Sequence, residues 1–141
     1  MMEWSFEGQM EVAQTIANQW GEWMRANGVQ EVVVEGEGVG TRAAVSSQVQ
    51  HQGQWVNNAL PMELVRLGVD LRVAMGRPGG GAWTWARLSM SSSQGYKLIS
   101  DFDYDREPVL DPPYTAEDCA KELEVFPRDP GAIPDWMKIG A

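Results

Sequence analysis

The acidic segment DFDYDRE, residues 101–107, is the densest group of side chains in the sequence that could do chemistry. Alternate side chains of a β-strand point to opposite faces, so Asp101, Asp103 and Asp105 are expected on one face and the aromatic residues between them on the other. Neighbouring carboxylates could hold a metal ion or act as acid and base. They could equally form a solvated surface or, together with Glu107, a charged surface for a partner protein.

Other features of the sequence argue against catalysis and against a metal. An EF-hand calcium loop would need glycine and glutamate where Arg106 and Pro112 stand. His51 is the only histidine and lies in a polar segment typical of an exposed turn. Cys119 is the only cysteine and lies on an apolar helical stripe, where a thiol behaves as a small hydrophobic group. We therefore expect no catalytic residue, no metal and no cofactor, and a protein that is not an enzyme.

Two glycine-rich segments resemble phosphate-binding loops only superficially. Gly36, Gly38 and Gly40 have the wrong spacing for a dinucleotide-binding loop, and a strand-like segment follows them instead of a helix. They predict a tight hairpin turn. Residues 79–81 lack the lysine and hydroxyl residue that end a P-loop, and they predict a plain connection.

Two tryptophans precede the acidic segment in the same predicted hairpin. Trp83 and Trp85 are expected to share one face of their strand, and if Met90 pairs with Tyr96, Trp85 lies opposite Asp101. Either a helix covers these indoles or they anchor a partner protein. The residues that we expect to contact a partner are Trp83, Trp85, Asp101, Asp103, Asp105 and Glu107.

The pattern of apolar residues predicts the elements that position this surface. Residues 7–26 and 61–75 carry apolar side chains at helical spacing, and a third helix begins after Thr115, which can cap it. Strands are expected near residues 32–34, 41–49, 83–90 and 96–104, with a possible short one around Trp55. These elements predict a single α+β domain, residues 1–141, in the order α-β-β-α-β-β-α. An antiparallel sheet of four or five strands would pack against the helices, and residues 126–141 would form an extended C-terminal tail.

The charge of the chain narrows the kinds of partner. The formal net charge is -9, and residues 101–141 hold eleven acidic against four basic side chains. Such a field repels nucleic acid and anionic lipid and attracts a basic protein. No signal peptide or membrane span is visible, and a lone cysteine is typical of a reducing compartment, so we expect a cytoplasmic protein.

The second half of the chain, residues 71–137, resembles the YezG-like immunity proteins of bacterial polymorphic toxin systems, including those with LXG-type toxins. Three ordered segments carry the resemblance: the loop 77–81 leading into the two tryptophans, the strand end DFDYD followed by Glu107-Pro108, and the motif FPRDPGAIPDWM at 126–137. The resemblance implies an immunity protein that binds and neutralises a cognate toxin domain. The acidic end favours a basic toxin, as nucleases usually are.

Two other classes of function remain open at this point. A protein-interaction adaptor would share the aromatic and acidic surfaces but bind a partner other than a toxin. A small metal-dependent enzyme would have to use the carboxylates of residues 101–107, because no other dense set of titratable groups is present.

Overall fold

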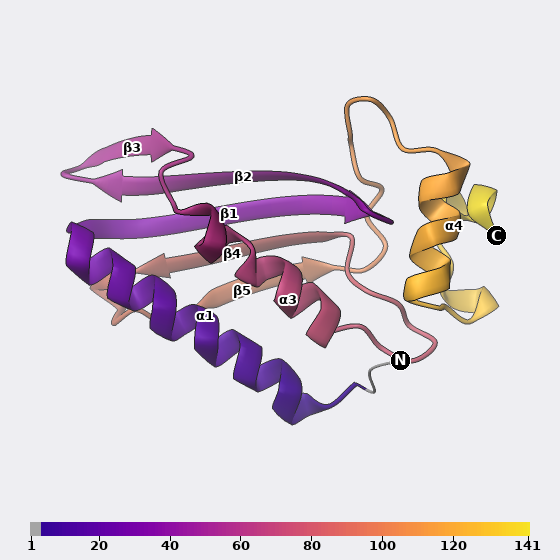
Figure 1. Ribbon diagram of the computed structural model, residues 1–141, viewed down its shortest axis with the longest axis horizontal. Coiled ribbons are helices and arrows are strands. Elements are labelled where there is room, and N and C mark those ends of the chain that lie inside the picture. Colours follow the sequence, from indigo (N-terminus) through magenta and orange to yellow (C-terminus); the bar gives the residue numbers. More distant parts are fainter. Residues whose placement is uncertain (1–3) are drawn as a thin grey trace.

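The computed structural model describes residues 4–141 and shows an α+β fold in which helices pack against one antiparallel sheet (Figure 1). The strands lie in the order β3-β2-β1-β4-β5. The helices are α1 (Phe6–Asn27), α2 (Met62–Val65), α3 (Leu67–Ala74) and α4 (Ala116–Val125). The strands are β1 (Val29–Val39), β2 (Arg42–His51), β3 (Gln54–Asn57), β4 (Trp85–Ser91) and β5 (Ile99–Asp103). Short 3₁₀ helices span η1 (Ser92–Gln94), η2 (Pro130–Ala132) and η3 (Asp135–Gly140). The predicted fold class is confirmed, and the possible strand around Trp55 is β3.

Helix α1 forms where its apolar stripe predicts it. The Ser5 hydroxyl accepts a hydrogen bond from the Gly8 amide at 3.0 Å, which caps the first turn. Gly28 ends the helix in the left-handed conformation, at a φ of 65°. Ile16, Trp20 and Met24 are fully buried against the sheet. These three side chains hold the C-terminal half of α1 against the sheet.

The second predicted helix is broken into α2 and α3 at Arg66. The Leu64 carbonyl at the break accepts a hydrogen bond from the Trp20 indole at 3.0 Å. Leu64 and Leu71 are both buried, one from each short helix. The helix is interrupted near the point where Trp20 of α1 binds its backbone. The apolar spacing of residues 61–75 nevertheless still places Leu64 and Leu71 in the core.

The glycines of the first hairpin correct the predicted strand boundary. Gly36 and Gly38 lie inside β1, and only Gly40 belongs to the turn, with a φ of +67°. A Cβ at Gly40 would come within 2.6 Å of the Asp118 carbonyl oxygen, so that position also needs glycine for space. Pairing of β1 with β2 on one side and β4 on the other overrides the poor strand propensity of glycine.

The second hairpin has a longer connection than its sequence predicted. Trp85 pairs with Asp103 and Arg87 with Asp101, a register two residues away from the expected one. The reason is that the connection continues past Gly95 through Tyr96, which has a positive φ, and β5 begins only at Ile99, so residues 96–98 are not strand as expected. A shift of two residues leaves each side chain on its expected face but changes its cross-strand partner.

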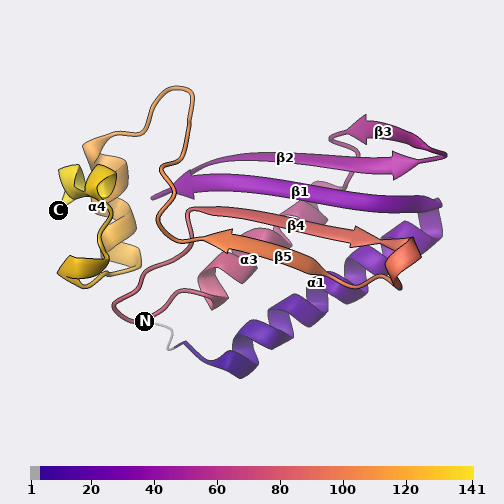
Figure 2. The same cartoon turned by 180° about the vertical axis from the view of Figure 1, so that it is seen from behind.

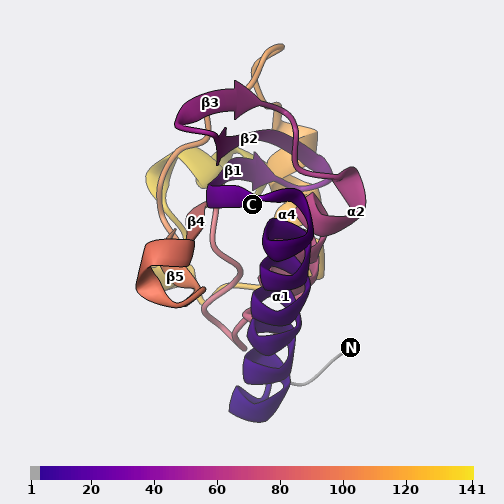
Figure 3. The same cartoon turned by 90° about the vertical axis from the view of Figure 1, so that its left-hand side faces the viewer.

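The helices leave one face of the sheet open. Helices α1 and α2 lie on the same side of the sheet, as the edge-on view shows (Figure 3), and α3 packs against both of them. From behind, no helix crosses the strands (Figure 2). The sheet therefore has a covered face, on which these helices lie, and an open face on its other side.

The C-terminal region corrects a second expectation. Residues 126–141 do not form an extended tail but fold into η2 and η3, and η3 packs beside α4 at the end of the sheet (Figure 1). Val39, Cys119 and Met137 are buried together in a small second core there. The prolines do exclude a long helix, but apolar side chains such as Met137 supply enough contact to fold the chain back.

Candidate functional site

The open face of the sheet is predominantly acidic. Strand alternation places five carboxylates on it, from β1 and β5, and the Arg87 guanidinium between them. The carboxylate residues are Glu31, Glu35, Glu37, Asp101 and Asp103. Arg87 makes no ion pair within 4 Å in residues 4–141, although carboxylates lie on both neighbouring strands.

The register arranges these charges in rows across three strands. Glu35, Arg87 and Asp101 lie side by side in one row. Glu37, Trp85 and Asp103 form the next row. Acidic residues on β1 and β5 thus flank one cationic and one aromatic side chain on β4, which gives a surface of defined order instead of scattered charge.

Trp85 is fixed in the middle of this surface. Its indole N–H donates a hydrogen bond to the Glu35 carboxylate at 3.1 Å. The Arg106 guanidinium lies over its ring, 4.7 Å from the centroid. The ring is half-buried, so part of its apolar surface still faces solvent. An ordered aromatic ring of this kind can contact a partner with little loss of side-chain entropy.

A shallow depression of about 190 Å³ lies on the open face, between β1 and β2. Glu35 and Glu37 line it together with Ser46 and Val109. The Val109 amide donates a hydrogen bond to the Glu37 carboxylate, which fixes the loop after β5 against the sheet. Two carboxylates beside a depression of this size can accept the end of a lysine or arginine side chain.

The structure separates the acidic residues that the sequence placed together. Asp101 and Asp103 lie on the open face, but the Asp103 carboxylate also accepts hydrogen bonds from the Asp105 and Arg106 amides at 2.9 and 3.0 Å. Asp105 has left the strand, and its carboxylate accepts a hydrogen bond from the Arg128 guanidinium at 3.0 Å. The predicted row of three carboxylates on one face is therefore wrong for Asp105, because β5 ends at Asp103.

Glu107 belongs to the C-terminal region of the molecule. Its carboxylate accepts a hydrogen bond from the Tyr114 hydroxyl at 2.5 Å. Burial, together with the neighbouring Glu107 carboxylate, raises the pKa of Tyr114 to about 12. Tyr114 packs edge-on against Trp136, with ring centroids 5.3 Å apart. Glu107 thus helps to hold the C-terminal segment in place.

Trp83 corrects the prediction that both tryptophans share one face. It lies on the covered face, is only 7 % exposed and packs against Phe102, with ring centroids 5.6 Å apart. Alternation fails because β4 begins only at Trp85. Thr84 is fully buried, and its hydroxyl donates to the Arg106 carbonyl at 2.6 Å. A helix-covered indole was one of the two expected outcomes, and it applies to Trp83 alone.

The lone histidine and the lone cysteine, which the sequence analysis also considered, lie apart from the open face. His51 is exposed at the end of β2, and Cys119 is fully buried. Burial and nearby carboxylates raise the pKa of the Cys119 thiol, which keeps it protonated. In residues 4–141 no group of three histidine, cysteine, aspartate or glutamate side chains is placed to hold a metal ion. No helix in that part of the chain is long and apolar enough to cross a membrane.

Sequence reasoning missed the three glutamates of β1. Glu31, Glu35 and Glu37 lie four and two residues apart, which puts them on one face of a strand, with Val32, Val34 and Gly36 on the other. Reading Gly36 and Gly38 as turn residues hid that signal.

Compared with known proteins, the sequence matches no family model and no curated protein. The resemblance of residues 71–137 to YezG-like immunity proteins therefore stays a prediction.

Proposed function

We propose that this protein is a cytoplasmic immunity protein that binds a basic bacterial toxin domain through the open face of its sheet. The observation that carries the proposal is the depression lined by Glu35 and Glu37 on the open face, together with the Trp85 indole that donates a hydrogen bond to Glu35 on the same face. The resemblance of residues 71–137 to YezG-like immunity proteins supplies the identity of the partner class.

The chemistry of the open face suits a protein partner of opposite charge. A stable interface between proteins buries about 1,600 Å² in total, and its centre commonly contains aromatic anchors. Trp85 would provide the anchor, and Glu35 and Glu37 would receive a cationic side chain from the toxin. The outer carboxylates Glu31 and Asp101 would attract the toxin during association.

The test uses charge reversal at positions that do not hold the fold together. Neither Glu31 nor Asp101 makes a side-chain hydrogen bond or ion pair within residues 4–141 that the reversal would break. Asp103 is unsuitable because it accepts two backbone hydrogen bonds. The matched control is Glu11→Lys with Glu22→Lys on the exposed side of α1, which changes the net charge by the same amount.

The assay needs the cognate toxin domain, which we expect to be encoded directly upstream of this protein's gene. Glu31→Lys with Asp101→Lys should slow association about tenfold at low salt and less at high salt, because opposite charges on the two proteins accelerate encounter. The control pair should have a much smaller effect. Stopped-flow association at two ionic strengths measures this, and survival of cells producing the toxin measures protection. Equal rates for both double variants would exclude the open face as the binding surface, and no binding at all would contradict the immunity function.

A further inference from the structure

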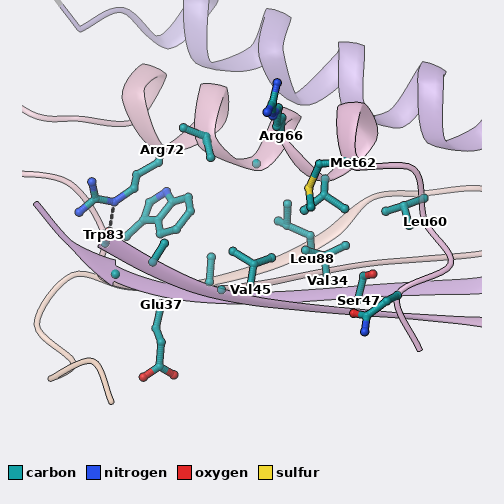
Figure 4. Close-up of a pocket in the computed structure, with 18 residues that line it drawn as sticks. Val34, Glu37, Val45, Ser47, Leu60, Met62, Arg66, Arg72, Trp83 and Leu88 are labelled. Carbon is teal, nitrogen blue, oxygen red and sulfur yellow. Dashed lines mark hydrogen bonds between the residues drawn. The ribbon is translucent and has the colours of Figure 1, made fainter. Parts of the chain in front are cut away.

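A second hollow lies on the covered face, on the other side of the sheet from the proposed toxin contact. It has a volume of about 370 Å³ and lies between the sheet and helices α2 and α3 (Figure 4). Val34, Val65 and Leu88 are among its apolar walls. The mouth of the cavity is marked by three exposed side chains, Val45, Met62 and Val69, with exposed fractions of 49 %, 66 % and 56 %. Its size and lining are those of a small-molecule pocket.

Two glycines keep this cavity open although neither position requires glycine. Gly68 lies in α3, where glycine is a poor helix former. A Cβ at Gly68 would meet only the Leu88 Cδ1 atom, at 4.0 Å. At Gly36 a Cβ would make ordinary contact with Val45 Cγ2, at 3.5 Å. Neither glycine has a positive φ. A Cβ is therefore tolerated at both positions, and because both glycines line the cavity, a larger side chain at either would take up part of its volume.

The indole of Trp83 supplies a hydrogen-bond donor without an acceptor. Trp83 lines the cavity, and its ring reaches into it from the strand side (Figure 4). Its N–H is buried and has no partner within residues 4–141. By contrast, the indole N–H groups of Trp20 and Trp85 donate to Leu64 and Glu35. An unsatisfied buried donor is costly, so an acceptor from a bound molecule would complete this site.

The charges around the cavity favour an uncharged ligand. The Arg72 guanidinium beside the indole donates to the Trp83 carbonyl at 2.7 Å and to the Glu122 carboxylate at 2.8 Å, so a buried counter-ion neutralises it. Figure 4 shows the Glu37 carboxylate pointing away from the cavity, on the open face. The Arg66 side chain points away from the sheet in the same view.

We propose that this cavity binds a small, uncharged, apolar molecule that carries one hydrogen-bond acceptor, and that the acceptor binds the Trp83 indole N–H. Acetophenone and ethylbenzene form a matched pair of probes, because they have nearly the same shape and only acetophenone has a carbonyl oxygen. Binding is measured by titration of ¹⁵N-labelled protein. The indole N–H resonance of Trp83 is assigned with Trp83→Phe.

Acetophenone should bind with saturation, shift the Trp83 indole resonance and bind roughly tenfold more tightly than ethylbenzene, which is the effect of one hydrogen bond. Ethylbenzene is the more hydrophobic probe, so simple partitioning would give the opposite order. In Trp83→Phe the preference for acetophenone should disappear. Absence of saturable binding, or the same preference in Trp83→Phe, would overturn the proposal.

Filling the cavity gives a second and independent readout. Gly68→Leu should weaken acetophenone binding at least tenfold without lowering the Tm, because the new side chain takes the place of the ligand. Gly36→Val tests the opposite wall if Gly68→Leu does not fold. The matched control is Gly131→Ala, far from the cavity walls, where a Cβ would meet nothing within 4 Å. Unchanged affinity in both folded cavity variants would place the probe elsewhere and contradict the proposal.

Discussion

Strand β1 contributes side chains of opposite character to the covered face and to the open face of the sheet. Val32 and Val34 of β1 are buried under the helices, whereas Glu35 and Glu37 on the same strand face solvent. Charges follow the same division. The Arg72–Glu122 pair near the covered face is buried, and the carboxylates of the open face have no such counter-ion within 4 Å in the described residues. The buried contacts that stabilise the fold therefore lie on the covered face and its supports, whereas the open face carries charges without a buried counter-ion.

The largest effect should come from breaking the buried ion pair. The Glu122 carboxylate is fully buried and accepts hydrogen bonds from Arg72 at 2.8 Å and from the Gly40 amide at 2.9 Å. Glu122→Ala should lower the free energy of unfolding by about 3–5 kcal/mol, because Arg72 would keep a charge in a poorly solvated place without its partner. Equilibrium urea unfolding measures this difference.

The control for this change is Glu124→Ala on the same helix. Glu124 pairs with Lys121 at 3.6 Å, but its side chain is 70 % exposed. Such a pair contributes about 1 kcal/mol or less. Similar losses in the two variants would mean that the buried pair does not join α3 to α4 as the geometry indicates.

Neighbouring valines on β1 test the two faces directly. Val32 is fully buried under α1, and Val33 lies half-buried on the open face. Val32→Ala should lower the free energy of unfolding by about 2 kcal/mol, through lost apolar contact and a residual cavity. Val33→Ala should cost less than about 1 kcal/mol. The same urea experiment compares them, and a larger loss at Val33 would show that the open face is covered in solution.

Much of the fold could be predicted from local patterns in the sequence. The stripe of α1 predicts a helix because its buried residues recur at three- and four-residue intervals. Thr115 caps the helix that follows it, as the sequence predicts, and the cap is a capping box with Asp118 as the second member. Both features depend on residues close together in the chain, which is why one sequence suffices to find them.

The candidate site was harder to predict because its geometry depends on distant contacts. Asp105 leaves the open face because Arg128, from beyond α4, binds its carboxylate. Trp83 lies on the covered face because Thr84 is held by the loop that follows β5. Gly36 stays in a strand because β1 has partners on both sides. Periodicity carries no information about such long-range contacts.

The smallest expected change in stability comes from removing one carboxylate, and it compares a carboxylate that supports the fold with one that faces solvent. Hydrogen bonding from the Thr115 amide, at 2.8 Å, is the main cause that lowers the pKa of Asp118 below 3.8, and Arg42 contributes at 3.4 Å. A carboxylate with a lowered folded-state pKa stabilises the fold above its unfolded pKa, and that contribution is lost as pH falls through the folded-state pKa. Asp118→Ala should therefore be less stable than the native protein at neutral pH.

The pH dependence makes this last comparison specific. The stability difference between the native protein and Asp118→Ala should be full above pH 3.8 and should shrink as the pH falls further, because the native carboxylate then takes up a proton. Asp101→Ala on the open face is the matched control and should show no comparable loss at neutral pH, since no hydrogen bond or ion pair holds its carboxylate within residues 4–141. Urea unfolding of all three proteins at neutral and acidic pH measures both effects. A difference for Asp118→Ala that stays constant into acid would assign its role to packing of the helix start and not to the charge of the carboxylate.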